Sequence, residues 1–538
     1  MKILLFITGF KQLEEYKYLN LFLKKLNLNK SCDIYIYCNN SLISSDIIKY
    51  YQMFDQTNKY LHITSLNSGY RIGGVEAVSQ GIEMGIFKNY DYVIHLHPDV
   101  FITDDYYLTQ ILSENINNNI IFFITKCLPD NDNFFSFDFF IFKPKLLTTN
   151  IFIDELYTFT GDPENYLHDM IKKHNINYIF IKRFENNNYL PRRIDENLKL
   201  YHEHDIDKVI NIFNNLKTIA FLSNSLTLRG TEVVLYDYAY YNEKILGNKS
   251  IIITREFNSI NNHIDVDRNV YNKFKKRFQI EYYKNDNPTN EIDDFIEKNN
   301  ISYLYIIKSG EYDQLLSTKC KNLIHCVFST QQPHGDIYSV VGQTINDINK
   351  TNYPVVPHIV NLPKIDNNLK LELNIPIDAI VFGRYGGKDS FDIKFVHNVI
   401  KKLLDLYNNI YFIFMNTNIF YEHKNIIYLP GNCDLIYKRK FINTCDALLH
   451  ARFRGETFGL TCGEFAICEK PVITWGNSSE KEHLNILKNH AIIYYNYFDL
   501  FNILSTFYKN KYDMKNNGYM FYTPENVMEI FKKIYLDN

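Results

Sequence analysis

The chain has 538 residues, enough for about three domains that each bury a core. Apolar residues make up 46% and charged residues 22%, which is ordinary for a globular protein, and the formal net charge of −3 excludes the basic field of a nucleic-acid-binding protein. No apolar run reaches the length of a membrane span.

Nine cysteines are scattered along the chain without a C-x-x-C pair, and their spacing fits no zinc framework. This pattern indicates reduced thiols and a cytoplasmic protein. The apolar run after Met1-Lys2 is short and soon meets Glu14 and Glu15, so it indicates a first core strand rather than a signal peptide. Peripheral attachment to a membrane remains open.

From residue 1 to about 215, apolar runs alternate with amphipathic stretches, as in an α/β domain. We expect strands at residues 3–8, 33–37, 60–63, 92–96, 120–125 and 178–181, and a helix at 14–26. Polar residues dominate from 192 to 215, which places the first domain boundary near residue 215.

Polar side chains gather at the end of the apolar run 92–96. His95, His97 and Asp99 alternate along the chain, so a strand places them on one side. Imidazole and carboxylate together suit Mn²⁺. The pattern therefore predicts a metal site, although two histidines near a strand end are also common without one.

This segment resembles the Asp-x-Asp position of GT-A glycosyltransferases of the family-2 type, with His97 in place of the first aspartate. The resemblance implies a nucleotide-sugar site in which Mn²⁺ or Mg²⁺ is held on the diphosphate. It assigns the metal ligands Asp99, His97 and His95, with His202 and His204 returning from later in the chain. It places Asn67, Gly69 and Arg71 near the nucleotide.

Residues 163–169 resemble the helix that supplies a catalytic carboxylate in inverting members of that family. The resemblance assigns this role to Glu164 and Asp169. The plainer interpretation of Glu164 is a charge in the first turn of a helix, where it complements the helix dipole.

Two further α/β starts follow. Strand 218–222, loop 223–231, helix 232–241 and strand 250–254 form the opening βαβ unit of a Rossmann-like domain, with further strands at 303–307 and 323–328. A third start has strand 379–384, helix 392–407 and strands 410–414, 426–429, 447–450 and 472–474. We expect domains at 1–215, 216–370 and 371–538.

Near the C-terminus, Glu456 and Glu464 stand eight positions apart across the turn Phe458-Gly459. A glycine turn that opens a helix exposes backbone N–H groups, and the helix dipole favours an anion there. Two glutamates beside a bound diphosphate would accept hydrogen bonds from sugar hydroxyls. The alternative is an ordinary loop and helix with two solvated carboxylates.

The stretch resembles the donor site of retaining GT-B glycosyltransferases of the glycosyl transferases group 1 type. The resemblance implies that Glu456 contacts the transferred sugar and Glu464 the ribose, with Phe458 and Gly459 forming the turn between them. It also implies that Arg384 and Lys388 neutralise the diphosphate, and that no metal is needed in this domain. The same resemblance implies that the last helix, 524–535, crosses back onto the middle domain.

The middle domain would face this donor site. Leu228-Arg229-Gly230-Thr231-Glu232 resembles the family's glycine-rich loop, with Gly230 its only glycine where two are common. His325 would lie at the rim near the transferred sugar, although a lone histidine in an apolar strand is more often a satisfied core residue. Pro357-His358 resembles the loop that links the two domains.

The preferred interpretation is a tandem, bifunctional glycosyltransferase with a GT-A-like domain followed by a GT-B pair. It would take nucleotide sugars as donors and extend a surface glycan, polysaccharide or lipid-linked acceptor. Three alternatives stay open: a single active GT-B transferase with an N-terminal acceptor- or partner-binding domain, a nucleotide-sugar 2-epimerase on the GT-B fold, and a glycan-binding scaffold without activity.

Overall fold

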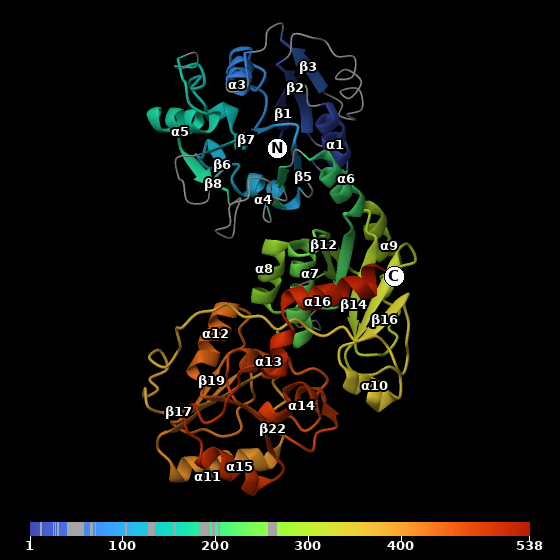
Figure 1. Cartoon of the computed structure of the whole chain (residues 1–538), viewed down its shortest axis with the longest axis vertical. Helices are drawn as coiled ribbons and strands as arrows, with labels where there is room; N and C mark the ends of the chain where they lie inside the picture. Colours follow the sequence, from blue (N-terminus) through green and yellow to red (C-terminus); the bar gives the residue numbers. More distant parts are fainter. Residues whose placement is uncertain are drawn as a thin grey trace. The chain divides into compact units, whose positions relative to one another are not determined.

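The computed structural model describes residues 1–537 except 11–12, 25, 27, 29–31, 40–58, 65–67, 70–71, 103–104, 127–134, 155, 157, 182–193, 196–199, 203–204 and 257–265. The chain divides into two compact units, Met1–Leu216 and Lys217–Asn538. Each unit is an α/β structure built on parallel or mainly parallel sheets, which confirms the fold class expected from the sequence (Figure 1).

The first unit is built on a seven-stranded sheet of order β3-β2-β1-β4-β7-β6-β8. Strand β7 runs antiparallel to β4 and β6, and the other pairs are parallel. The strands are β1 (Ile3–Gly9), β2 (Cys32–Cys38), β3 (Lys59–Ile63), β4 (Tyr92–Leu96), β6 (Phe122–Lys126), β7 (Phe135–Phe142) and β8 (Tyr178–Phe180). A small sheet pairs β5 (Val100–Ile102) with β10 (Leu200–His202), and β10 with β9 (Ile194–Asp195).

Helices cover both faces of this sheet because its strands alternate their apolar side chains between two cores. In β1, Ile3, Leu5 and Ile7 join one core, while Leu4 and Phe6 join the other. Helices of the first core are α1 (Leu13–Leu23), α4 (Tyr106–Glu114) and α6 (Ile206–Asn215); those of the second are α3 (Gly73–Glu83) and α5 (Pro163–Lys173).

The second unit contains two lobes, each with a six-stranded parallel sheet. The first lobe has the order β13-β12-β11-β14-β15-β16. Its elements are β11 (Thr218–Ser223), α7 (Gly230–Lys244), β12 (Lys249–Arg255), α8 (Arg268–Arg277), β13 (Gln279–Tyr283), α9 (Thr289–Lys298), β14 (Tyr303–Lys308), β15 (Lys321–Cys326), β16 (Ile337–Val340) and α10 (Gln343–Asn349).

The second lobe has the order β19-β18-β17-β20-β22-β24. Its elements are β17 (Ile380–Tyr385), α11 (Lys394–Leu406), β18 (Ile410–Met415), β19 (Ile426–Leu429), α12 (Leu435–Thr444), β20 (Ala447–His450), β21 (Gly455–Glu456), α13 (Leu460–Ile467), β22 (Val472–Trp475), β23 (Glu480–Lys481), α14 (Glu482–Leu487), β24 (Ala491–Tyr494) and α15 (Tyr497–Ser505). Strands β21 and β23 pair separately from the main sheet.

The end of the chain returns to the first lobe. Helix α16 (Pro524–Phe531) and the π-helical turn Lys532–Leu536 place Phe531 and Tyr535 in the same buried cluster as Phe221 and Tyr238, and the red helix lies along α7 in Figure 1. Lys217 Nζ donates to the carbonyl oxygen of Leu536 at 2.9 Å. The second unit therefore begins and ends on the same lobe.

Within the described ranges, no helix is long and apolar enough to cross a membrane.

Candidate functional site

A cavity of about 420 Å³ lies between the two lobes of the second unit. The first lobe contributes the segment Thr227–Val234, which covers the end of the loop after β11 and the first turn of α7. It also contributes parts of α8 and His358. The second lobe contributes residues after β17, the start of α12 and the segment Glu456–Thr461. These positions follow the carboxyl ends of parallel strands, where open α/β sheets bind ligands.

Glu464 is held in the cavity wall by two donors. The residue as a whole is 3% exposed. Lys438 Nζ, from α12, donates to Oε1 at 2.7 Å, and the hydroxyl of Tyr385 donates to Oε2. A buried carboxylate needs such partners to compensate for lost hydration. The glutamate is therefore fixed in one orientation before any ligand arrives.

Glu456 has a different set of partners. His450 Nε2 lies 3.1 Å from Oε1, and Arg452 Nη1 donates to Oε2 at 2.9 Å. Burial by itself raises the pKa of the Glu456 carboxyl, but the hydrogen bond from His450 and the charge of Arg452 outweigh it and lower the pKa to about 2. Glu456 is therefore a carboxylate at neutral pH.

A buried chain of hydrogen bonds continues behind Glu456. His450 Nδ1 lies 2.8 Å from Thr474 Oγ1, and His483 Nε2 lies 3.0 Å from the same oxygen. Burial lowers the pKa of His483 to about 3, so this imidazole is neutral. The chain fixes the orientation of the His450 ring, and with it the position of the Glu456 carboxylate.

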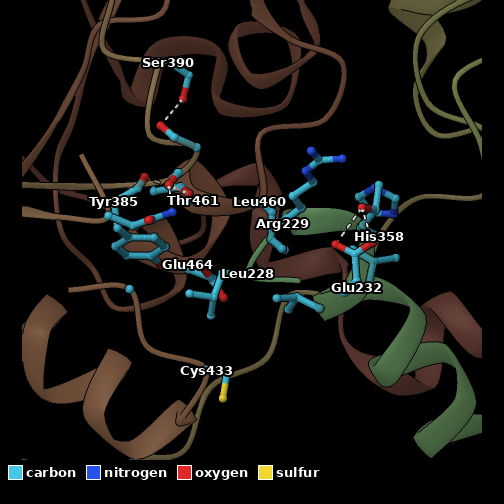
Figure 2. A pocket seen from close by; sticks show the side chains of 18 of the residues that line it. Leu228, Arg229, Glu232, His358, Tyr385, Ser390, Cys433, Leu460, Thr461 and Glu464 are labelled. Atoms are coloured by element: carbon cyan, nitrogen blue, oxygen red, sulfur yellow. Dashed lines mark hydrogen bonds between the residues drawn. The ribbon is translucent and has the colours of Figure 1, made fainter. Parts of the chain in front are cut away.

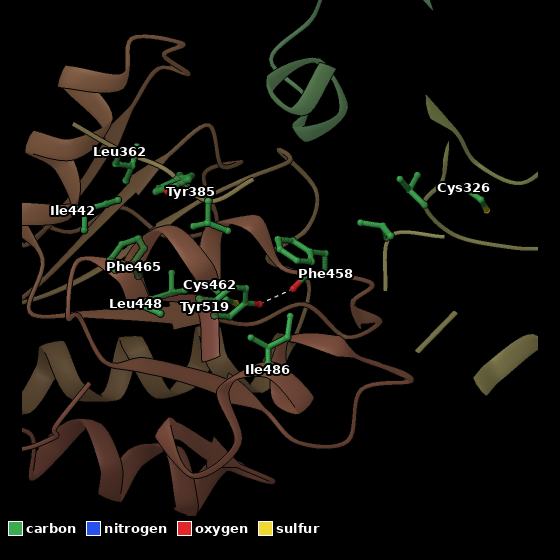
Figure 3. Packing of buried hydrophobic residues seen from close by; sticks show 14 of the residues in the cluster. Cys326, Leu362, Tyr385, Ile442, Leu448, Phe458, Cys462, Phe465, Ile486 and Tyr519 are labelled. Atoms are coloured by element: carbon green, nitrogen blue, oxygen red, sulfur yellow. Dashed lines mark hydrogen bonds between the residues drawn. The ribbon is translucent and has the colours of Figure 1, made fainter. Parts of the chain in front are cut away.

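The glycine turn between the two glutamates opens α13 into the cavity. Gly459 has φ +84°, and a Cβ there would lie 2.8 Å from His483 Cβ and 2.9 Å from the Tyr519 hydroxyl oxygen. That hydroxyl also donates to the carbonyl oxygen of Phe458 at 2.5 Å (Figure 3). No side chain caps α13, and Thr461 of its first turn lines the cavity. Its first N–H groups are thus available to an anion.

Of the two cations expected beside the diphosphate, Arg384 lines the cavity and Lys388 does not. Arg384 lines the cavity but is 4% exposed, and its guanidinium donates to Gly387 O at 2.8 Å and to Ser390 Oγ at 2.6 Å. It also donates to Thr417 Oγ1 and, at 3.4 Å, to Asn416 O. Burial lowers its pKa to about 10. Lys388 is exposed and does not line the cavity.

The loop before α7 forms the opposite wall. Nothing lies within 4 Å of the place a Cβ would take on Gly230, so the backbone there is open to a ligand. The buried carboxylate of Glu232 accepts hydrogen bonds from Thr227 and Thr231, each at 3.0 Å. Burial raises the pKa of Glu232, and these hydroxyls counteract part of that rise.

His325 lies in the core of the first lobe rather than at the cavity. Its side chain is fully buried in β15, its Nδ1 lies 2.6 Å from the Tyr305 hydroxyl, and burial lowers its pKa to about 3. His358 lines the cavity instead, with its ring 5.2 Å from that of Phe458 and 5.5 Å from that of His325. The linking loop that the sequence indicated thus supplies the cavity's histidine from this lobe.

The expected metal ligands of the first unit lie at the carboxyl end of β4. His95 is fully buried, with Nε2 2.8 Å from Thr8 Oγ1 and its ring stacked on Phe140. Burial lowers its pKa well below the usual range. The His97 ring lies 5.5 Å from that of His95, and Asp99 is buried beyond it. In the described part of the chain, no three His, Cys, Asp or Glu side chains form a metal-binding group.

Other expected residues of the first unit are placed only in part. Asn67, Arg71 and His204 lie outside the described residues, and of His202 only the backbone is described, paired with Val100. Gly69 has φ +91° before α3. Glu164 lies in the first turn of α5, and the exposed Asp169 lies 2.9 Å from His168 Nδ1.

Sequence reasoning missed the side chains that hold the two glutamates. Lys438 and Tyr385 hold Glu464, while His450 and Arg452 hold Glu456. Arg452 stands four positions before Glu456, a visible signal. Lys438 lies on a different helix from Glu464, and only the tertiary structure brings them together.

The sequence matches no protein-family model and no curated protein sequence. Among solved structures, a glycosyltransferase from Rickettsia africae ESF-5 matches with 16% identity over 60% of this chain and 100% of its own, at a TM-score of 0.44. Anabaena Alr3699/HepE with UDP and glucose matches with 14% identity over 59% of this chain and 98% of its own, at 0.43.

S. aureus MnaA with UDP matches with 10% identity over 60% of this chain and 97% of its own, at a TM-score of 0.40. Similarity at this level carries no information on activity. The activity has to be inferred from the residues of the cavity.

Proposed function

We propose that residues 217–538 form a glycosyltransferase of the GT-B type that transfers a sugar from a nucleotide-sugar donor to a growing glycan. The observation that carries this proposal is the pair Glu456 and Glu464, fixed on either side of the uncapped N-terminus of α13 in a cavity between two lobes. A cavity of this kind offers N–H donors to a diphosphate and carboxylates to sugar hydroxyls.

The ionisation of Glu456 limits its role in this reaction. With a pKa of about 2 it has no proton to give, so it does not act as a general acid at neutral pH. It accepts hydrogen bonds from the transferred sugar and stabilises positive charge that develops on the sugar ring. The leaving diphosphate is stabilised by the N–H groups of α13, which are already oriented.

Glu464 fits the role of holding the ribose. Each of its oxygens accepts one protein hydrogen bond and keeps a further lone pair for a ligand hydroxyl. Because its two partners are buried, the carboxylate does not have to reorganise when the donor binds. In this proposal Glu456 contacts the transferred sugar, and Glu464 contacts the ribose of the nucleotide.

We also propose that the first unit is a second transferase with a GT-A-like site, which would make the chain bifunctional. Asp99 lies between β4, which ends at Leu96, and β5, which begins at Val100, and the pairing of His202 with Val100 brings the chain back beside it. Asp99 and His97 have donor atoms that suit Mn²⁺ or Mg²⁺. His95 does not fit as a ligand, because its Nε2 is hydrogen-bonded to Thr8 and its ring is buried.

The test uses the full chain and a panel of nucleotide sugars, with and without Mn²⁺, and measures donor binding by calorimetry and turnover by mass spectrometry. We expect Glu464→Gln to weaken donor binding about 10- to 100-fold through the loss of a charged acceptor, and Glu529→Gln on the exposed face of α16 to change nothing. A wild-type chain that binds no nucleotide sugar would contradict the transferase and leave a scaffold.

The same experiment separates the remaining alternatives. Transfer that needs Mn²⁺ and is lost in Asp99→Asn, beside a metal-independent transfer lost in Glu464→Gln, supports two active sites. If Asp99→Asn leaves all transfer intact, the first unit binds acceptor or partner. Interconversion of the donor sugar without any acceptor would identify a 2-epimerase instead.

A further inference from the structure

Five arginines and lysines among the described residues line the cavity, and four of them already have partners. Lys438 pairs with Glu464 and Arg452 with Glu456. The guanidinium of Arg384 donates hydrogen bonds to the loop after β17 and to Thr417, which follows β18. Lys273 Nζ lies 4.2 Å over the Tyr236 ring and 3.5 Å from the carbonyl oxygen of Cys433.

The fifth cation, Arg229, has an exposed side chain at the start of α7. No ion pair or side-chain hydrogen bond joins its guanidinium to another described residue; its charge acts on Glu232, the acid that Thr227 and Thr231 already satisfy. In Figure 2 the Arg229 side chain extends into the open part of the cavity and no hydrogen bond is drawn to it.

The loop that contains Arg229 has a single glycine, Gly230, where two are common in the glycine-rich loop that it resembles. A second glycine would bring only backbone to a ligand. Arginine brings a charge with five donors in a planar fork that matches phosphate oxygens. The same chain leaves Lys388, the expected phosphate cation, outside the cavity.

We propose that Arg229 is the cation that binds the diphosphate of the donor, in place of Lys388. This inference rests on the proposed function of the second unit. Because Arg229 belongs to the first lobe and the N-terminus of α13 to the second, a bound diphosphate would connect the two lobes. Arg229 thereby stabilises the leaving group as well as the bound donor.

The test measures binding of UDP, UMP and uridine to the full chain by calorimetry, after confirming that UDP binds. We expect Arg229→Gly to weaken UDP binding about 10- to 100-fold, in line with the loss of charge-assisted hydrogen bonds, and to leave uridine binding unchanged. Arg229→Lys keeps the charge without the fork and gives an intermediate loss. Lys388→Ala, the matched control, leaves both affinities unchanged.

The comparison of UDP with uridine in one protein excludes a general loss of structure, because misfolding would weaken both. Equal losses for UDP and uridine, or an unchanged UDP affinity in Arg229→Gly beside a loss in Lys388→Ala, would overturn the assignment while the proposed function stands. If the wild-type chain binds no UDP, GDP or ADP, the proposed function itself fails. Where transfer is measured, Arg229→Gly should lower kcat as well as raise KM.

Discussion

At Glu456, two opposing effects set the pKa of the carboxyl group: burial raises it, and neighbouring positive groups lower it. The carboxyl group has a folded pKa of about 2, below its ordinary value of 4.5, because His450 and Arg452 outweigh the effect of burial. A lowered pKa contributes stability that is complete above the unfolded value and is lost as the pH falls towards the folded one. Because the Glu456 side chain is 23% exposed, water screens part of this interaction. We therefore take the contribution of the lowered pKa to the free energy of unfolding as about 2–3 kcal/mol.

We therefore expect Glu456→Gln to lower the free energy of unfolding by about that amount at pH 7, and the difference from wild type to shrink as the pH falls from 4.5 towards 2. Urea denaturation at several pH values measures it, with Glu529→Gln as an exposed control. A difference that does not change with pH would contradict the low pKa.

Lys438 and Glu464 form a buried ion pair, with side chains 8% and 4% exposed. Lys438→Ala leaves the carboxylate without its charge partner, and we expect a loss of about 3–5 kcal/mol in the free energy of unfolding. The double variant Lys438→Met, Glu464→Leu removes both charges and should regain much of that loss. Chemical denaturation of the single and double variants tests this, and equal stability of the two would contradict it.

The residues of the site could be predicted from the sequence where chain spacing alone brings them together. Glu456 and Glu464 lie in the wall of one cavity because a glycine turn and one helix join them. Arg384 and Lys388 have the same charge in the sequence, and which of them faces the cavity depends on the course of the loop between them. His358 reaches the cavity from a loop, which no strand or helix pattern indicates.

At the scale of elements, the turn at Gly459 sets where α13 begins. A side chain there would meet both His483 and the Tyr519 hydroxyl at under 3 Å in a left-handed backbone conformation. We expect Gly459→Ala to destabilise the protein by about 1–3 kcal/mol and to weaken donor binding by moving Glu456 relative to α13. Thermal unfolding and calorimetry measure the two effects.

Gly230 provides the matched comparison for that prediction. It also lines the cavity and begins a helix, but nothing lies within 4 Å of an added Cβ and its φ is not positive. Gly230→Ala should therefore leave stability unchanged or slightly raised. Similar destabilisation by both substitutions would show that backbone strain at Gly459 is not the cause.

Many of the sheet strands were predictable because buried parallel strands form continuous apolar runs. The expected strand at 92–96 coincides with β4, and the expected run at 379–384 lies within one residue of β17. The short strands β5, β16 and β21 were not expected, since two to four residues leave no periodic pattern. Their pairing depends on partners distant in sequence, such as β10 for β5.

At the scale of the whole molecule, the second unit begins and ends on the same lobe. Its first residue, Lys217, donates to Leu536, and α16 completes the core of the first lobe beside α7. The return of the last helix was expected only from the resemblance to GT-B folds, in which the last helix crosses back. The contacts that it makes there were not readable, because Phe531 and Tyr535 pack on side chains from strands some 200 or more residues earlier.

We expect residues 217–538, expressed alone, to fold and to bind the donor with the affinity of the full chain. The cavity, both glutamates and Arg229 all lie within this unit, and its core is shared between its own lobes. Because the N–H groups of α13 and the guanidinium of Arg229 neutralise the charge of the diphosphate in this proposal, no metal is needed. EDTA should therefore not change the affinity for the donor. Calorimetry on the fragment, with Glu464→Gln as the control with weakened donor binding, tests both statements. A folded fragment that binds donor only with Mn²⁺ would contradict them, since a metal would then supply the charge that we assign to Arg229.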